Sequence, residues 1–293
     1  MSAKRAVALG MFDGIHTGHL AVISAALEYK SRGLVPCVLV FDVHPMALLS
    51  DDPPPELMTY SQKVSYINSL GAEVVTVKFA DIAGLSCEDF FEEYLVKHLN
   101  AGVLCCGYNY RFGKGGKGNT ELLRELCGNR GIELKVVDEI DFDGEPVSST
   151  RIRKLLQEGN VALANKLLGR NFVFDFPVVQ GDGRGHKMKI PTVNQLFPDK
   201  FIIPKLGVYA SFADIGGKEL PSVTNIGTCP TFDGTELRSE TFIIGYDGDL
   251  YNRKISVSLT DYLRPEKKFE DQQALVCQIN RDIQSSLNIF NNR

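Results

Sequence analysis

The chain has 293 residues, 44% of them hydrophobic, and a net charge of −4, so two globular domains with apolar cores are expected. The net charge lacks the positive balance of a nucleic-acid-binding surface. The longest apolar run (34–41) is too short to span a bilayer, and the N-terminal segment reaches the charged Asp13 too soon to be a signal peptide. Seven cysteines without a CxxC motif indicate free core thiols in a reducing cytoplasm, and we expect no nucleic-acid or membrane partner.

Strand and helix patterns alternate through the first half of the chain. This alternation predicts a doubly wound parallel sheet, whose ligands bind beyond the carboxyl ends of the strands. Apolar strand-like runs lie at 6–9, 35–41, 74–77, 103–106 and 134–137, and helical patterns lie at 19–31, 60–69, 87–98 and 120–129.

A glycine-rich turn after the first strand carries His16 and His19 at the start of a helix. Residues three apart share a helix face, so both imidazoles can point at one group, and Gly18 leaves the backbone open to a flat group. Helix starts favour anions, so the pair suits a phosphate whose charge grows during a reaction. A metal pair, or two partly buried histidines without a role, are the alternatives, although this motif supplies only two metal ligands.

Two further polar motifs follow predicted strands. Phe41-Asp42-Val43-His44-Pro45 stands at a strand exit, either in a site or as a simple turn with a solvated His44. Residues 107–118 contain five glycines and three cations, which indicates a flexible basic loop that contacts phosphate. A mobile, solvated loop is the alternative.

Residues 147–156 begin a helix with Ser148 or Ser149 as the N-cap. Arg151 and Arg153 lie in its first turn, where the helix dipole disfavours cations. An anion bound there would resolve this conflict, and arginines that point outward are the alternative.

The sequence pattern changes after a short helix at 160–170. Gly, Asp and Pro separate short β-rich runs, which predicts a small antiparallel barrel, and an amphipathic helix follows at 270–286. The β-rich runs lie at 172–179, 207–212, 222–226, 240–244 and 255–259. We therefore expect two domains, 1–170 and 171–293.

The second domain has its own glycine and cation loop at 181–187, followed by Pro191-Thr192-Val193-Asn194. Thr192 and Asn194 alternate onto one side of an extended segment. Their hydroxyl and amide oxygens suit Mg²⁺ that carries phosphates. Glu240, in a later predicted strand, offers a carboxylate that can accept a hydroxyl proton.

Taken in order, these motifs resemble those of the bacterial bifunctional riboflavin kinase/FAD synthetases, over nearly the whole chain. In the first domain the resemblance rests on GMFDGIHTGH (10–19), FDVHP (41–45), GYNYRFG (107–113) and SSTRIR (148–153). In the second it rests on GDGRGHKMKIPTVN (181–194), NIGTCPTF (225–232), ETF (240–242) and LRPEKKF (263–269).

The resemblance implies that the first domain, a Rossmann-like nucleotidyltransferase, transfers AMP from ATP to FMN and releases pyrophosphate. His16 and His19 would be its catalytic residues. The implied ATP contacts are Gly10, Phe12, Asp13, Gly14, Gly18, Ser149, Thr150 and Arg153, and the implied FMN contacts are Phe41, His44, Pro45 and Asn109.

The second domain, by the same resemblance, phosphorylates riboflavin with ATP to give FMN. Glu240 would be the base, and Thr192 and Asn194 would bind Mg²⁺. The implied ATP contacts are Gly181, Gly185, Lys187, Pro191 and Arg264. Flavins are then substrate and product, and Mg²⁺ accompanies ATP in both steps.

Four residues depart from the family pattern, among them His186, near a usual Arg or Lys, and Val193, which replaces Ala. Lys189 stands where the family has Gly, and Asn252 replaces Gly in an LYG turn. A long cation where the backbone normally approaches ATP would alter binding, so an enzyme with only the adenylyltransferase active is one alternative. A non-catalytic flavin-binding regulator, and adenylylation of another phosphorylated substrate, are further alternatives.

Overall fold

The computed structural model describes residues 3–181, 190–231 and 234–291. The chain divides into two compact units, Met1–Ser149 and Thr150–Arg293. Two hydrogen bonds join helices α7 (Ser149–Glu158) and α8 (Val161–Leu168) to later parts of the second unit. Asn165 Nδ2 donates to the Leu259 carbonyl at 2.9 Å, and the Lys205 N–H donates to the Leu156 carbonyl at 2.9 Å. The functional boundary near residue 170 stays a prediction.

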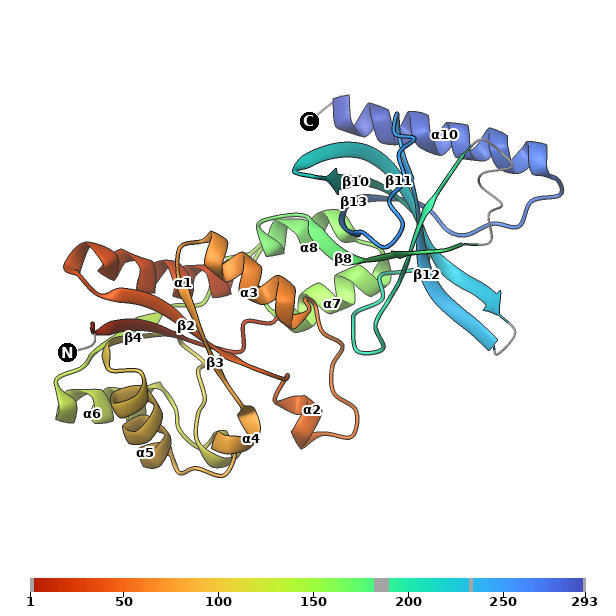
Figure 1. The fold of residues 1–293 in the computed structure, drawn as a ribbon. Helices are drawn as coiled ribbons and strands as arrows, with labels where there is room; N and C mark the ends of the chain where they lie inside the picture. Colours follow the sequence, from red (N-terminus) through yellow and green to blue (C-terminus); the bar gives the residue numbers. More distant parts are fainter. Residues whose placement is uncertain (1–2, 182–189, 232–233, 292–293) are drawn as a thin grey trace. The chain divides into compact units, whose positions relative to one another are not determined.

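The first unit contains a five-stranded sheet in the order β3-β2-β1-β4-β5, and every neighbouring pair is parallel. Figure 1 labels β2, β3 and β4 of this sheet. The predicted doubly wound sheet is therefore confirmed. Its strands are β1 (Arg5–Leu9), β2 (Val35–Phe41), β3 (Glu73–Val77), β4 (Ala101–Gly107) and β5 (Glu133–Val137). Its helices are α1 (Thr17–Glu28), α2 (Met46–Leu49), α3 (Tyr60–Ser69), α4 (Phe79–Ile82), α5 (Cys87–Asp89) and α6 (Thr120–Arg130), and a short hairpin pairs β6 (Asp141–Phe142) with β7 (Glu145–Pro146).

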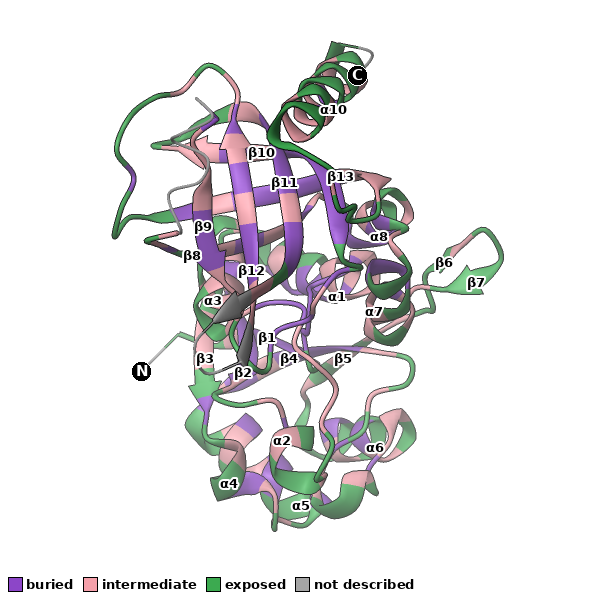
Figure 2. Ribbon diagram, turned by 90° about the vertical axis from the view of Figure 1, so that its right-hand side faces the viewer, coloured by how far each residue is buried: buried purple, intermediate pink, exposed green. Residues whose placement is uncertain are grey.

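Both faces of this sheet are covered, which explains why its central strands are apolar without alternation (Figure 2). On β1, Val7 and Leu9 pack into the cluster that includes Phe91 and Leu95, whereas Ala6 and Ala8 pack into the cluster that includes residues of α1. The small side chains on the second face let α1 approach the centre of the sheet.

Two predicted helices differ in detail from the structure. The pattern at 19–31 corresponds to α1 followed by a 3₁₀ turn, Tyr29–Arg32, which ends at Gly33 with φ +80°. The pattern at 87–98 begins as the single turn of α5 and continues as a π-helix, Phe90–His98, whose Phe90, Phe91 and Leu95 are buried. Apolar spacing alone does not distinguish the tighter 3₁₀ turn or the wider π-helix from an α-helix.

The second unit is a closed barrel in the strand order β10-β11-β12-β9-β8-β13, and all its pairs are antiparallel. The predicted barrel with a terminal helix is confirmed. The strands are β8 (Phe172–Val179), β9 (Val193–Leu196), β10 (Gly207–Ile215), β11 (Lys218–Thr231), β12 (Gly234–Ile243) and β13 (Lys254–Arg264), and α10 (Gln272–Asn291) follows. Strand β9 is only four residues long, and the sequence predicted an extended segment around Thr192 and Asn194 without predicting a strand there.

Buried hydroxyl groups connect neighbouring barrel strands. Ser211 Oγ lies 3.0 Å from Ser222 Oγ and 2.8 Å from Thr224 Oγ1, and Thr224 Oγ1 lies 2.9 Å from Thr241 Oγ1. All four residues are fully buried, so each hydroxyl replaces its lost water contacts with this chain of hydrogen bonds. Outside the barrel, α10 packs Phe290 against Phe212, with 4.2 Å between the ring centroids.

The seven cysteines are free, and the predicted core location holds for five of them. Burial raises the pKa of the Cys37, Cys105 and Cys106 thiols to about 12, which keeps them protonated and unreactive. Cys277 differs from the prediction, because it is exposed on α10. Across the described ranges, the helices are too short or too polar to cross a membrane.

Candidate active sites

The turn after β1 is a tightly folded segment with unusual backbone geometry. Phe12, Gly14 and Ile15 have φ angles of +51°, +75° and +40°. Phe12 and Ile15 are fully buried, so core packing offsets the strain of these conformations. The buried Asp13 carboxylate accepts a hydrogen bond from the Leu57 N–H at 3.0 Å, and a Cβ at Gly14 would lie 2.7 Å from Leu57 Cδ1. Asp13 and Gly14 therefore shape the turn.

The turn delivers His16 and His19 to the start of α1 as a stacked pair. Their ring centroids are 3.7 Å apart at an interplanar angle of 18°. His16 is the N-cap of α1, and its Nδ1 accepts a hydrogen bond from the His19 N–H at 3.3 Å. In the neutral imidazole the proton of His16 is then on Nε2, which makes that nitrogen a donor.

Gly18 has a structural role in addition to the one expected. A Cβ at this position would lie 3.2 Å from Cε1 and Nδ1 of the His16 ring. The space that glycine leaves therefore accommodates the imidazole of His16 itself.

His19 is a neutral imidazole near physiological pH. Burial, followed by the charges of His16 and Lys63, holds its pKa well below the ordinary value of 6.5. Its Nδ1 is buried and has no hydrogen-bond partner among the described atoms. A buried polar atom of this kind is available to a ligand group.

The histidines line a cavity of about 570 Å³ at the carboxyl ends of the strands. Several predicted site residues meet there: Gly10, Phe12, His16, Gly18, His19, Phe41, Pro45, Asn109 and Ser149. His44 is absent from the lining, and its Nδ1 accepts from the Met46 N–H at 3.2 Å. An apolar wall of Phe79, Ile82 and Phe90 was not predicted, because these residues follow from how α4 and the π-helix pack rather than from a motif.

The basic loop after β4 is more tightly packed than its composition indicates. The backbone groups of Phe112 and Gly118 pair with each other at 3.2 and 2.9 Å, and the Phe112 side chain is buried. A Cβ at Gly113, where φ is +72°, would lie 2.6 Å from Cys87 Sγ. Phe112 therefore anchors this loop in the core, and the phosphate contact of the loop stays a prediction.

The predicted SSTRIR motif lies where the two units meet in the sequence. Ser149 Oγ donates to the Asp13 carbonyl at 2.8 Å and so secures the turn after β1. Helix α7 begins at Ser149, with Thr150 exposed and Arg153 partly exposed. The ATP contacts of Thr150 and Arg153 remain predictions.

In the barrel, strand register aligns three polar residues across neighbouring strands. Glu240 of β12 pairs with Asn194 of β9 on one side and with Asn225 of β11 on the other. Directly paired residues in antiparallel strands share a face of the sheet, so the carboxylate and the two amides lie on one face.

Asn194 is held by two neighbours. Its Nδ2 donates to the Thr192 carbonyl at 3.2 Å, and a Cβ at Gly181 would lie 2.5 Å from that same nitrogen. Glycine at 181 therefore makes the space that the Asn194 amide fills. Thr192 and Pro191 line a cavity of about 250 Å³ together with residues of the β12–β13 connection.

The structure describes Asn252, one of the residues that depart from the family pattern. Asn252 has φ +61°, a conformation that glycine adopts freely and asparagine tolerates better than most residues. Gly185, Lys187 and Lys189 lie outside the described residues.

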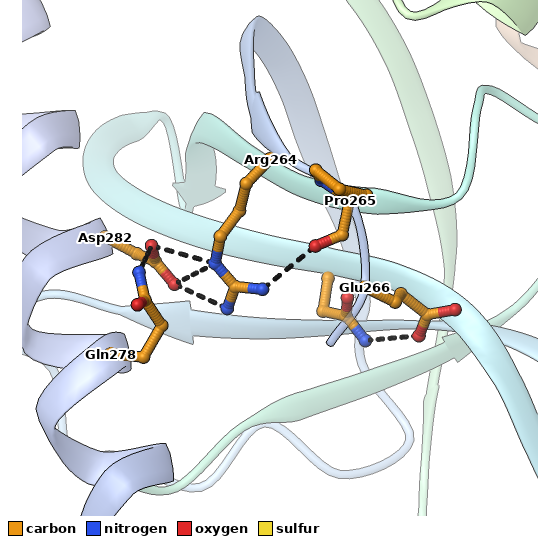
Figure 3. A network of polar contacts seen from close by, with 6 residues as sticks. Arg264, Pro265, Glu266, Gln278 and Asp282 are labelled. Carbon is orange, nitrogen blue, oxygen red and sulfur yellow. Dashed lines mark hydrogen bonds and ion pairs between the residues drawn. The ribbon is translucent and has the colours of Figure 1, made fainter. Parts of the chain in front are cut away.

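Arg264 makes an ion pair with the C-terminal helix. Its guanidinium donates to both carboxylate oxygens of Asp282 on α10, at 2.8 to 3.1 Å, and Gln278 Nε2 donates to Asp282 Oδ1 at 2.9 Å (Figure 3). Two residues further on, Glu266 Oε1 accepts from Asn225 Nδ2 at 3.4 Å. The Arg264–Asp282 ion pair thus fixes the end of β13, and Glu266, two residues beyond it, contacts Asn225 of β11.

The fold and the two sites define a two-part enzyme, with a nucleotidyltransferase-like sheet domain and a barrel that carries a kinase-like set of polar groups. Residues 1–151 match the FAD synthetase family and residues 168–290 match the riboflavin kinase family. The chain belongs to the bifunctional riboflavin kinase/FMN adenylyltransferases, which are enzymes of flavin cofactor biosynthesis.

Relatives of that name match along nearly their whole length. The Bacillus subtilis protein is 34% identical, with 99% of this chain and 94% of that protein covered. The Escherichia coli K12 protein is 35% identical, with 94% and 89% covered. A crystal structure named as a macrolide-efflux protein from Streptococcus pneumoniae has a TM-score of 0.89 at 29% identity, with 98% of this chain and 95% of that chain covered.

Proposed function

We propose that this chain makes FMN from riboflavin and then FAD from FMN, with ATP as the second substrate of both steps. The observation that carries the proposal is that one chain holds two separate sets of reactive groups. The stacked His16–His19 pair lines the cavity of the first unit, and the row of Asn194, Glu240 and Asn225 crosses three strands of the second.

In the kinase step, the ribityl hydroxyl of riboflavin attacks the γ-phosphorus of ATP, and ADP leaves. Glu240 is the base that accepts the hydroxyl proton. Phosphoryl transfer depends mainly on positioning and charge stabilisation, so one aligned carboxylate is sufficient as the acid–base group.

Thr192 and Asn194 fit a magnesium ion by their donor chemistry. Asn194 Nδ2 is engaged by the Thr192 carbonyl, so the amide oxygen is the atom of that side chain suited to a metal. Together with the Thr192 hydroxyl it provides the oxygen ligands that Mg²⁺ prefers. When bound, Mg²⁺ would neutralise phosphate charge.

In the adenylylation step, a phosphate oxygen of FMN attacks the α-phosphorus of ATP, and pyrophosphate leaves. The FMN phosphate is already an anion, so no protein base is required. His16 and His19 donate hydrogen bonds to the phosphates, and the buried setting strengthens these bonds.

Isotope placement tests the proposal directly. With riboflavin and γ-labelled ATP, both FMN and FAD should carry label, whereas α-labelled ATP should label FAD and leave FMN unlabelled. When FMN replaces riboflavin, γ-label should appear in pyrophosphate and not in FAD. Label from α-labelled ATP in FMN, or no labelled flavin with either ATP, would refute the proposed pair of reactions.

A further inference from the structure

The charges that line the first unit's cavity are unevenly distributed. Among the described lining residues, Arg111 carries the permanent positive charge, and Asp138 and Glu139 carry negative charges. His19 contributes hydrogen-bonding capacity but no charge, because its pKa is lowered. Adenylylation brings the phosphates of ATP and FMN together, so a positive side chain where they meet would stabilise their combined charge beside the Mg²⁺ that accompanies ATP.

The backbone on both sides of Arg111 is fixed. The Tyr110 and Phe112 rings stack with 5.9 Å between centroids and an angle of 10°, and Phe112 is buried. A Cβ at Gly116 would lie 3.6 Å from Arg111 Cβ, so the loop folds back against this residue. The Arg111 side chain itself is exposed, and no hydrogen bond or ion pair joins it to the described residues. Its guanidinium is therefore anchored by its backbone but available to a ligand.

Sheet topology brings Arg111 and the histidines to the same crevice. The strand order reverses between β1 and β4, and ligands of doubly wound sheets bind at this point. His16 and His19 follow β1, and Arg111 follows β4, its neighbour. Asp138 and Glu139 follow β5, one strand further out, where the Tyr108 hydroxyl donates to the Glu139 carboxylate.

We propose that Arg111 binds the reacting phosphates in the adenylylation step. A guanidinium can contact two phosphate oxygens at once, which a single imidazole cannot do. As the FMN oxygen bonds to the α-phosphorus, the bond to the β-phosphate oxygen breaks and its electron pair leaves with pyrophosphate. Arg111 keeps its proton and stabilises the charge that grows on that leaving group. This assignment rests on the proposed FMN adenylylation.

The test compares Arg111→Gln and Arg111→Lys in the full chain with Arg124→Gln, an exposed arginine on the adjacent helix α6 that does not line the cavity. Arg111→Gln should lower kcat/KM for FAD formation from FMN by about a hundredfold, the usual effect of removing one charge-stabilising donor. Arg111→Lys should recover about tenfold of this loss, since it restores charge but not the two-pronged contact. Riboflavin phosphorylation should be unchanged in all three variants.

Pyrophosphate inhibition provides a second measurement. If Arg111 contacts the leaving group, the inhibition constant of pyrophosphate should rise about tenfold in Arg111→Lys, a variant that keeps the charge and loses the fork geometry. FAD formation by Arg111→Gln within about threefold of wild type would overturn the assignment, as would an equal loss in Arg124→Gln. Absence of FAD formation by the wild-type chain would instead refute the proposed function.

Discussion

Gly181→Ala should selectively disable the barrel site, and the structure gives the reason. Gly181 does not have a positive φ, so the effect of an added methyl group is steric. The new Cβ would lie 2.5 Å from Asn194 Nδ2 and 2.7 Å from Asn194 Cγ, closer than two such atoms can approach. Asn194 is only 6% exposed, so it cannot swing freely into solvent.

The size of the effect follows from two contributions. Overpacking a buried site of this kind costs about 1–3 kcal/mol, and loss of the hydrogen bond from Asn194 to the Thr192 carbonyl costs about 1 kcal/mol more. A displacement of the proposed metal ligand by about 1 Å lowers the rate of a positioned reaction by about a hundredfold. We therefore expect a modest loss of stability and a large loss of riboflavin phosphorylation.

The assay is chromatographic separation of flavins after incubation with riboflavin, ATP and Mg²⁺, with a parallel incubation that starts from FMN. Gly128→Ala in α6 is the matched control, since its added Cβ would meet no described atom within 4 Å apart from its chain neighbours and the backbone of its own helix. Gly181→Ala should still convert FMN to FAD at the control rate. Riboflavin phosphorylation by Gly181→Ala within about twofold of the control would refute the reasoning.

The histidine pair and Glu240 give three further predictions. His19→Ala should abolish FAD formation and leave FMN formation intact; normal FAD synthesis from FMN in this variant would remove His19 from the mechanism. Glu240→Gln should stop riboflavin phosphorylation alone, and FMN production at the wild-type rate would exclude it as the base. The pKa of folded His19 lies below its unfolded value of about 6.5, so between these two pKa values the unfolded chain binds more protons than the folded chain. The contribution of His19 to the free energy of unfolding is therefore complete above pH 6.5 and decreases as pH falls towards the folded pKa. Denaturant titrations between pH 5 and pH 7 (about the range of histidine titration) should show that this loss on acidification is smaller in His19→Gln, and an equal loss in both proteins would contradict the neutral assignment.

Local patterns predicted the elements that carry the fold. The apolar strands with intervening amphipathic helices led directly to the parallel sheet, and the predicted helix at 60–69 matches α3 at both ends, where Thr59 and Gln62 form a capping box. The barrel was predicted from turn residues that recur between short β-rich runs. These features depend on neighbours in the sequence, which is the information that spacing contains.

What escaped prediction depends on contacts between distant segments. The motif located His16 and Gly18, but only the structure shows that the imidazole of His16 fills the space above that glycine. Arg264 was expected at a nucleotide, whereas its partner in the structure is Asp282 on α10. The packing of the 107–118 loop depends on Phe112, which enters the core beside Cys87, and glycine content alone does not predict this contact.

The most direct test of two activities in one chain is a time course of the purified protein with riboflavin, ATP and Mg²⁺, followed by chromatography of the flavins. The account predicts that FMN appears first and that FAD follows at its expense. FAD that appears only when FMN is supplied would contradict a working kinase barrel, and the absence of both products would contradict the account as a whole.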